Sequence, residues 1–331
     1  MSRMDQEISD AVDTSTDSVN RTFDWLPWLQ LMRIGNVFTA FANILMGYLV
    51  IHSDAGIFHL GRSDFLPLAG LFAATFCLYC SGMVLNDVFD LEQDREQRPN
   101  SPLAAGRVRP EMAARLGWGL WLLGIGFSTT AGWNGFLLGL AVAFAIVAYN
   151  RILKKTFAAP AAMGACRFLN VLLGMSYAKS STPVIMGFED HHLIIAAGIG
   201  VFVAGLTWFA RTETQTSNRW MLGGAIGVMS LGFICLAYFP VKMSEAVQLH
   251  MTADSARMWF LVLAILILYR CVNAVVDPDP QRVQRGVIHA LRSLIFLDAS
   301  VVAVVSHPFL AVATLSLLFP MLICSKWIRT T

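Results

Sequence analysis

A cluster of acidic residues is the part of this sequence best suited to chemistry. Five carboxylates fall within the ten residues from Asp87 to Glu96, although only 14% of the chain is charged. On a helix, Asn86, Asp90 and Asp94 share one face, and Asp87 lies one turn before Asp90. Like charges at this spacing repel one another unless a cation neutralises them. Hard oxygen donors favour Mg²⁺, which completes its shell with water and phosphate oxygens, so the cluster indicates a magnesium–diphosphate site.

The residues that follow the acidic cluster are basic and break the helix. They include four arginines, three prolines and one glycine: Arg95, Arg98, Arg107, Arg109, Pro99, Pro102, Pro110 and Gly106. Arginine clamps phosphate oxygens with a bidentate fork, so acids that hold a metal and arginines that hold phosphate would form one site. The alternative is a solvated, charged loop between two membrane spans, stabilised by its own ion pairs.

This segment resembles the first aspartate-rich motif of the UbiA superfamily of intramembrane prenyltransferases, NDxxDxxxD followed by an RPxRPLxxG-like tail. The matching residues are Asn86, Asp87, Asp90, Asp94, Arg98, Pro99, Pro102, Leu103 and Gly106. Ser101 stands where the family often has a second arginine. The resemblance implies that Asp87, Asp90 and Asp94 bind Mg²⁺ and act in catalysis, while Asn86 and Arg98 bind a prenyl diphosphate.

Two further segments match the family near a cytoplasmic turn. Arg33 and Asn36 form an Arg-x-x-Asn at the first apolar run; Asn36 is the expected substrate-binding residue, and Arg33 is either a site residue or an interfacial anchor. Tyr149 and Lys154 resemble the family's Tyr-x-x-x-x-Lys-Arg turn, which implies catalytic roles in which lysine captures the leaving diphosphate. Anchoring of basic turns at the membrane surface would also account for Lys154.

The second acidic motif of the family is degenerate in this chain. Where the family has Asp-x-x-x-Asp, only Glu213 remains, flanked by Arg211. We expect Glu213 to support a second metal ion with water and diphosphate, or Arg211 to bind phosphate directly. Loss of activity is the competing explanation. In the fifth apolar run, near 160–178, Asn170 is either a substrate-binding residue or a structural hydrogen-bonding group between helices.

The elements that must position these residues are membrane helices. The chain is 56% hydrophobic with a mean hydropathy of +0.59, which excludes an ordinary soluble domain. We predict an all-α, UbiA-like bundle of nine transmembrane helices, with ten as the alternative. The expected spans lie near 34–51, 66–86, 112–131, 134–150, 160–178, 193–211, 219–239, 257–276 and 287–305, with a further apolar run near 309–325. Asp298 in the ninth run is a buried acid that needs a partner.

The chain is expected to form one domain after a polar tail. Residues 1–24 are predicted to be a disordered cytoplasmic tail and residues 25–331 a single transmembrane domain. Lysine and arginine gather in alternate turns, so the positive-inside rule puts the proposed active site on the cytoplasmic side of an integral, multi-pass membrane protein. No basic stripe with interleaved aromatics indicates a nucleic-acid partner.

Three functions remain open from the sequence. The first is Mg²⁺-dependent transfer of a prenyl group from a prenyl diphosphate to a lipid-soluble acceptor, with an aromatic acceptor favoured, inside the lipid bilayer. The second is a UbiA-like protein without transferase activity that binds or helps to export an isoprenoid or another metabolite. Arg167-Phe-Leu-Asn170 and Trp208-Phe-Ala-Arg-Thr-Glu213 resemble divergent members found with the ebo gene cluster, which is associated with metabolite export. The third is an ion-coupled secondary transporter.

Overall fold

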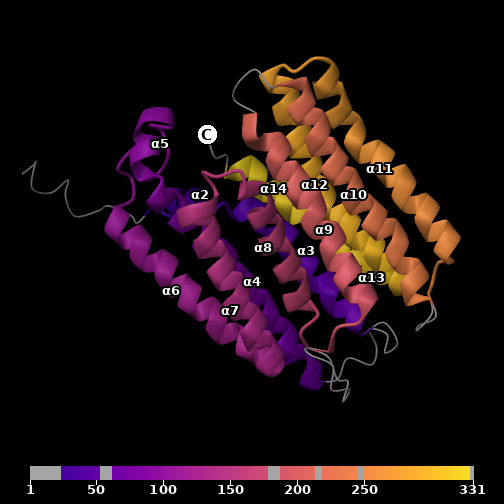
Figure 1. The fold of residues 1–331 in the computed structure, drawn as a ribbon. Coiled ribbons are helices and arrows are strands. Elements are labelled where there is room, and N and C mark those ends of the chain that lie inside the picture. Colours follow the sequence, from indigo (N-terminus) through magenta and orange to yellow (C-terminus); the bar gives the residue numbers. More distant parts are fainter. Residues whose placement is uncertain (1–23, 53–61, 178–186, 213–217, 245–248, 329–331) are drawn as a thin grey trace, which may run out of the picture.

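The helices of the chain lie side by side in a bundle (Figure 1). The computed structural model describes residues 24–52, 62–177, 187–212, 218–244 and 249–328, in which no strand occurs. The helices are α2 (Leu26–Leu31), α3 (Ile34–Ile51), α4 (Arg62–Phe89), α5 (Leu91–Gln97), α6 (Pro110–Ser128), α7 (Gly132–Ala148), α8 (Ala159–Gly174), α9 (Asp190–Phe209), α10 (Arg219–Met243), α11 (Ala253–Val276), α12 (Pro280–Val305), α13 (Pro308–Ser316) and α14 (Leu318–Trp327).

Most of these helices have the length and composition of membrane spans. Eight stretches of the described chain meet that description; one of them, Pro110–Leu153, holds both α6 and α7, while α8 is shorter but apolar. The predicted all-α bundle is therefore confirmed. Each of the nine expected runs corresponds to a helix, and the run expected near 309–325 is helical as well, because α13 and α14 together form the stretch Pro308–Trp327.

The hairpin of α6 and α7 follows the polar loop that comes after the acidic motif. The indole nitrogen of Trp121 in α6 donates a hydrogen bond of 2.9 Å to the carbonyl oxygen of Ala143 in α7. Gly132 begins α7 with a φ of 78°, a left-handed conformation that side chains with a Cβ disfavour. In Figure 1, α6 runs along one edge of the bundle and α11 along the opposite edge.

Close packing between helices relies on glycine in the second half of the chain. A Cβ atom on Gly232 of α10 would lie 2.7 Å from the carbonyl oxygen of Gly198 in α9. No other residue type fits that contact, so the two helix backbones approach each other as membrane helices commonly do at small residues.

The acid in the ninth apolar run has a partner that the sequence did not reveal. Asp298 of α12 is fully buried, and both of its oxygens accept hydrogen bonds from Asn43 Nδ2 of α3, at 2.8 and 2.9 Å. The Asn43 side-chain oxygen in turn accepts a bond of 3.0 Å from Arg167 of α8. One polar network therefore ties three helices together where lipid and apolar side chains offer no hydrogen bonds.

The predicted cytoplasmic tail lies almost wholly outside the described residues, which begin at Asp24. The Asp24 side chain accepts a hydrogen bond of 3.0 Å from the backbone nitrogen of Leu26 at the start of α2.

Candidate active site

The acidic motif lies at the junction of α4 and α5, at one end of the bundle (Figure 1). The prediction of one unbroken helix is wrong at a single residue: Asp90 has φ −96° and ψ 4° and separates the two helices. Backbone hydrogen bonds nevertheless continue from Asp90 to Asn86 at 3.0 Å and from Asp94 to Asp90 at 2.8 Å. The kink therefore redirects α5 and keeps the one-turn spacing of the acids.

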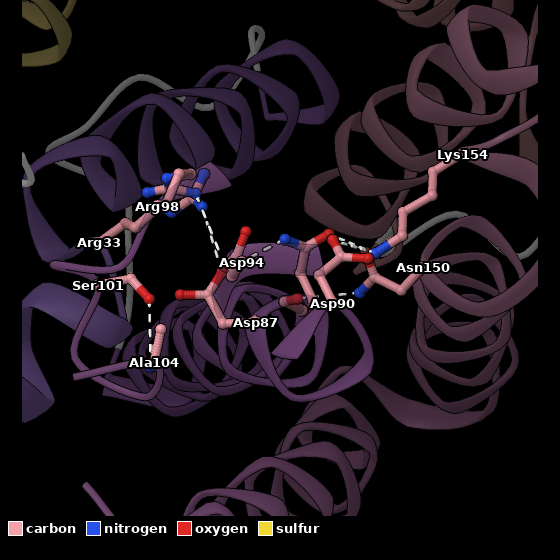
Figure 2. Close-up of polar contacts among 11 residues, drawn as sticks. Arg33, Asp87, Asp90, Asp94, Arg98, Ser101, Ala104, Asn150 and Lys154 are labelled. Carbon is pink, nitrogen blue, oxygen red and sulfur yellow. Dashed lines mark hydrogen bonds and ion pairs between the residues drawn. The ribbon is translucent and has the colours of Figure 1, made fainter. Parts of the chain in front are cut away.

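Each motif aspartate is paired with a different basic residue. The pairs are Arg33 Nη2 with Asp87 Oδ1 at 3.2 Å, Lys154 Nζ with Asp90 Oδ2 at 2.5 Å, and Arg98 Nη1 with Asp94 Oδ2 at 4.0 Å. Figure 2 shows that the two arginines approach the acids from one side and Lys154 from the other. The structure thus brings three cations to the acidic motif. Arg33 and Lys154 come from distant parts of the sequence, and Arg98 follows the end of α5.

Lys154 reaches the acids from a widened helical turn after α7. Residues Tyr149–Leu153 form a π-helical turn, closed by a hydrogen bond of 2.9 Å from the Lys154 backbone nitrogen to the Tyr149 carbonyl oxygen. The buried side chain of Asn150 fastens this turn to α4 by donating to the carbonyl oxygen of Gly82 at 2.9 Å. Lys154 Nζ also donates to Asn86 Oδ1 at 3.1 Å. Asn150 is absent from the predicted site residues, and its only sequence signal is an amide at the end of an apolar run.

Arg33 holds an unusual backbone conformation at the start of α3. Its φ of 48° makes it the one non-glycine residue with positive φ among those described. Such a conformation costs on the order of 1–2 kcal/mol for a residue with a Cβ. The Arg33 side chain is 30% exposed and its partner Asp87 only 5% exposed. The strained backbone conformation of Arg33 therefore accompanies an ion pair to the motif.

The loop that follows α5 is held by its own hydrogen bonds. Buried Ser101 accepts a bond of 3.3 Å from the backbone nitrogen of Ala104, and Gly106 has a φ of 70°. Arg107 donates to the Asn100 carbonyl oxygen at 2.9 Å and to Gln30 of α2 at 3.2 Å. Several of the motif's proline, serine and glycine positions therefore shape this loop.

A cavity of about 370 Å³ begins beside the motif and runs between the helices. Its lining includes four predicted site residues: Asn36, Asn86, Tyr149 and Asn170. Asn170 also joins helices, since it accepts a hydrogen bond from Thr75 Oγ1 and donates to the Ala40 carbonyl oxygen. The other lining residues include Leu78, Met83, Val142, Ile146, Met163 and Leu291. The cavity thus has a polar mouth and apolar walls.

The degenerate second motif is only partly described. Arg211 is exposed just after α9 and lies within electrostatic range of the Tyr149 hydroxyl. Glu213, the predicted metal ligand, lies outside the described residues.

The acids of the first motif fit Mg²⁺ bound together with a diphosphate. In the described parts of the chain, no three or more His, Cys, Asp or Glu side chains converge closely enough to hold a metal alone. Mg²⁺ does not require such a cage, because it binds through one or two carboxylates and the phosphates of its ligand. Asp90 Oδ1 is buried and has no hydrogen-bond partner in the described structure, so a carboxylate oxygen is available for that role.

Burial changes the acidity of the third aspartate. The pKa of Asp94 is raised above its ordinary value of 3.8 because burial disfavours the charged form. The neighbouring carboxylates of Asp87 and Asp90 raise this pKa further, and the guanidinium groups of Arg98 and Arg33 oppose the increase.

The fold and the site define a polytopic helical membrane protein with an acid–base cluster at the mouth of a largely apolar cavity. Residues 44–295 match the model of the UbiA prenyltransferase family. The chain therefore belongs to this prenyltransferase family, as the motif predicted, and is an integral, multi-pass membrane protein.

Individual relatives are similar at lower identity. The digeranylgeranylglyceryl phosphate synthase of Sulfurisphaera tokodaii is 32% identical over 39% of this chain, and the match spans less than half, 44%, of that protein. The synthase of the same name from Saccharolobus solfataricus is 22% identical over 84% of this chain and 86% of its own length. A UbiA homologue from Archaeoglobus fulgidus, solved with DMAPP and Mg²⁺, has a TM-score of 0.53 at 14% identity, with 81% of this chain and 98% of that chain covered. The structural likeness shows the fold.

Proposed function

We propose that this protein transfers a prenyl group from a prenyl diphosphate to a lipid-soluble acceptor within the membrane, and that the transfer depends on Mg²⁺. The observation that carries this proposal is the pairing of each motif aspartate with a cation, next to a 370 Å³ cavity that Arg33 and Asn86 line. Carboxylates suit a metal and the paired cations suit phosphate oxygens, so one ligand, a metal-bound diphosphate, satisfies both sets of groups.

The acidic and the basic residues of the site have distinct roles in this proposal. Asp87 and Asp90 would hold the metal, with Asp94 supporting it, and the bound ion would neutralise charge on the diphosphate. Arg33, Arg98 and Lys154 would then exchange their carboxylate partners for phosphate oxygens. The Lys154 side chain is 12% exposed and bonds Asn86, which lines the cavity. A lysine on a flexible stem is suited to follow the diphosphate as the leaving group departs.

The walls of the cavity suit the isoprenoid chain of the donor. Its methionine, leucine, isoleucine and valine side chains bury apolar carbon and exclude water from the reacting carbon. An acceptor hydroxyl oxygen would form the new bond to the first carbon of the prenyl group. The bond from that carbon to diphosphate would break, with its electron pair leaving on the diphosphate, which can take up the hydroxyl proton.

The relatives bear on the acceptor. The two synthases named above make a glyceryl phosphate lipid by name, so we propose an acceptor of that class in place of the aromatic acceptor favoured by the sequence.

We also propose that the site faces the cytoplasm. The motif loop and the turn after α7 carry Arg95, Arg98, Arg107, Arg109, Arg151, Lys154 and Lys155, which the positive-inside rule assigns to that side.

Diphosphate release by purified protein tests this function. Geranylgeranyl diphosphate, geranylgeranylglyceryl phosphate and Mg²⁺ should give diphosphate and a prenylated lipid, and chelation of Mg²⁺ should stop the reaction. Asp90→Ala should lower the rate about a hundredfold or more. Glu92→Ala is the matched control, because the Glu92 side chain is 85% exposed and pairs only with Arg95. Release that is unaffected by Asp90→Ala would contradict the proposal.

A further inference from the structure

A second cavity lies beside the first, between α3, α12 and α14. It measures about 220 Å³ and is lined by Arg33, Gly35, Asn36, Ile288, Leu291, Arg292, Met321, Ser325 and Ile328. Arg33, Asn36 and Leu291 line both cavities. A ligand in the second cavity would therefore lie one layer of side chains away from the first cavity and next to the Arg33–Asp87 ion pair.

The lining of the second cavity combines two cationic side chains with polar and apolar ones. Arg33 and Arg292 supply two guanidinium groups, and no carboxylate from the described part of the chain lines the space. Arg33 uses one nitrogen to bond Asp87, whereas Arg292 makes no hydrogen bond or ion pair with any residue in the described chain. The remaining wall is formed by isoleucine, leucine and methionine side chains together with Gly35, Asn36 and Ser325. This combination fits an amphiphile with an anionic headgroup.

Much of the wall comes from segments outside the family match. Met321, Ser325 and Ile328 belong to the C-terminal segment, beyond the matched residues 44–295. This segment packs directly on α3, since a Cβ atom on Gly35 would lie 2.8 Å from Ser325 Oγ. The cavity is therefore built in part by residues that the shared family pattern does not include, as expected for a specificity site.

We propose that this second cavity binds the phosphate headgroup of the acceptor lipid, with Arg292 as its binding residue. The inference rests on the proposed function. It adds to that function a binding site, the second cavity, and a residue, Arg292, that would select an acceptor with an anionic headgroup. Arg33 would link the two cavities, because its guanidinium contacts the motif and also lines the headgroup cavity. An ordinary membrane phospholipid offers the same phosphate chemistry, so the test must separate the two sources.

Two lipid probes and two variants test the assignment. The protein is placed in phosphatidylcholine nanodiscs and titrated with geranylgeranylglyceryl phosphate or with geranylgeranylglycerol, first without donor or Mg²⁺ and then during turnover. Arg292→Gln should weaken binding of the phosphate probe, and raise its KM, about tenfold or more. Binding of the alcohol probe, kcat and the KM for the donor should not change. Arg285→Gln on the same helix is the control, since Arg285 is exposed like Arg292 but lines a different surface, and its one hydrogen bond to a described residue goes to Gln281.

A second variant tests the position of the site independently of charge. Ser325→Trp should fill the cavity and weaken binding of the phosphate probe while donor binding persists. Unchanged phosphate-probe binding in Arg292→Gln, in a protein that still turns over, would overturn the inference and leave the proposed function standing. Displacement of the probe by phosphatidylglycerol at equal concentration would overturn the acceptor assignment in favour of a general phospholipid site. Arg292-dependent probe binding without turnover would uphold the headgroup site and reject the transferase.

Discussion

The three motif aspartates differ in what each could give to a metal. Asp87 is almost fully buried against Arg33, whereas Asp94 lies 4.0 Å from a half-exposed arginine. Asp90 bonds Lys154 through one oxygen and has a second buried oxygen without a partner in the described structure. Because an unpaired buried oxygen is costly to keep, Asp90 is the acid best prepared to gain a ligand.

Lys154 should affect the donor more than the neighbouring lysine does. Lys154→Met removes the cation that bonds Asp90 and Asn86, so we expect the affinity for a prenyl diphosphate in Mg²⁺ to fall about tenfold to a hundredfold. Lys155→Met is the control, since Lys155 is exposed and makes no hydrogen bond or ion pair with a described residue. Equal affinities of the two variants, measured by titration calorimetry, would remove Lys154 from the site.

The raised pKa of Asp94 predicts a pH-dependent stability in the absence of Mg²⁺. Burial raises the pKa of Asp94 in the folded protein. Its favourable contribution to the free energy of unfolding is therefore fully present below the pKa that Asp94 has in the unfolded chain, and it is lost as the pH rises through the pKa in the folded protein. Asp94→Asn should therefore unfold at a higher temperature than the parent protein at neutral pH, and the difference in unfolding temperature should narrow as the pH falls. A difference in unfolding temperature between the variant and the parent protein that grows as the pH falls would contradict this prediction.

At the scale of residues, the sequence predicted those that belong to a continuous motif. It did not predict those that only the folded structure brings to the motif. Asn86, the three aspartates and Lys154 were predicted from spacing and resemblance. Asn150 was missed and Arg33 left undecided, because a hydrogen bond to Gly82 and an ion pair to Asp87 join segments more than fifty residues apart.

At the scale of elements, small departures from ideal helices position the site. The break at Asp90 turns α5 away from α4, and the π-helical turn at Tyr149–Leu153 directs Lys154 towards the acids. π-helical turns are frequent at functional sites. Hydropathy predicted α3 with the bounds 34–51 that the structure has. It could not predict either departure, since both arise from local backbone geometry and not from apolar periodicity.

Asp298, in the network with Asn43 and Arg167, should support folding, and unlike Arg167 it does not line the donor cavity. Asp298→Leu would leave Arg167 partly uncompensated inside the bundle, so we expect the protein to lose about 3 kcal/mol of stability. Asp277→Leu is the control, because Asp277 and its partner Arg282 are 57% and 50% exposed and such pairs contribute little. Chemical unfolding in detergent would measure both. A similar loss of unfolding free energy in the two variants would show that the buried network contributes no more to stability than the exposed ion pair does.

At the scale of the whole molecule, the fold places two cavities on either side of one arginine. The first is bounded by helices from the first half of the chain together with α8 and α12, and the second by α3, α12 and α14. Composition and hydropathy predicted the membrane bundle, since they depend on sums over many residues. The cavities depend on which side chains meet between helices, which a single sequence does not specify.

The central claim is that the acidic motif binds a prenyl diphosphate through Mg²⁺. Its most direct test is calorimetric titration of the purified protein with a non-hydrolysable geranyl diphosphate analogue, with and without Mg²⁺. We predict saturable binding that requires Mg²⁺ and disappears in Asp90→Ala. Absence of binding in both conditions, or binding of equal strength without the metal, would contradict the account.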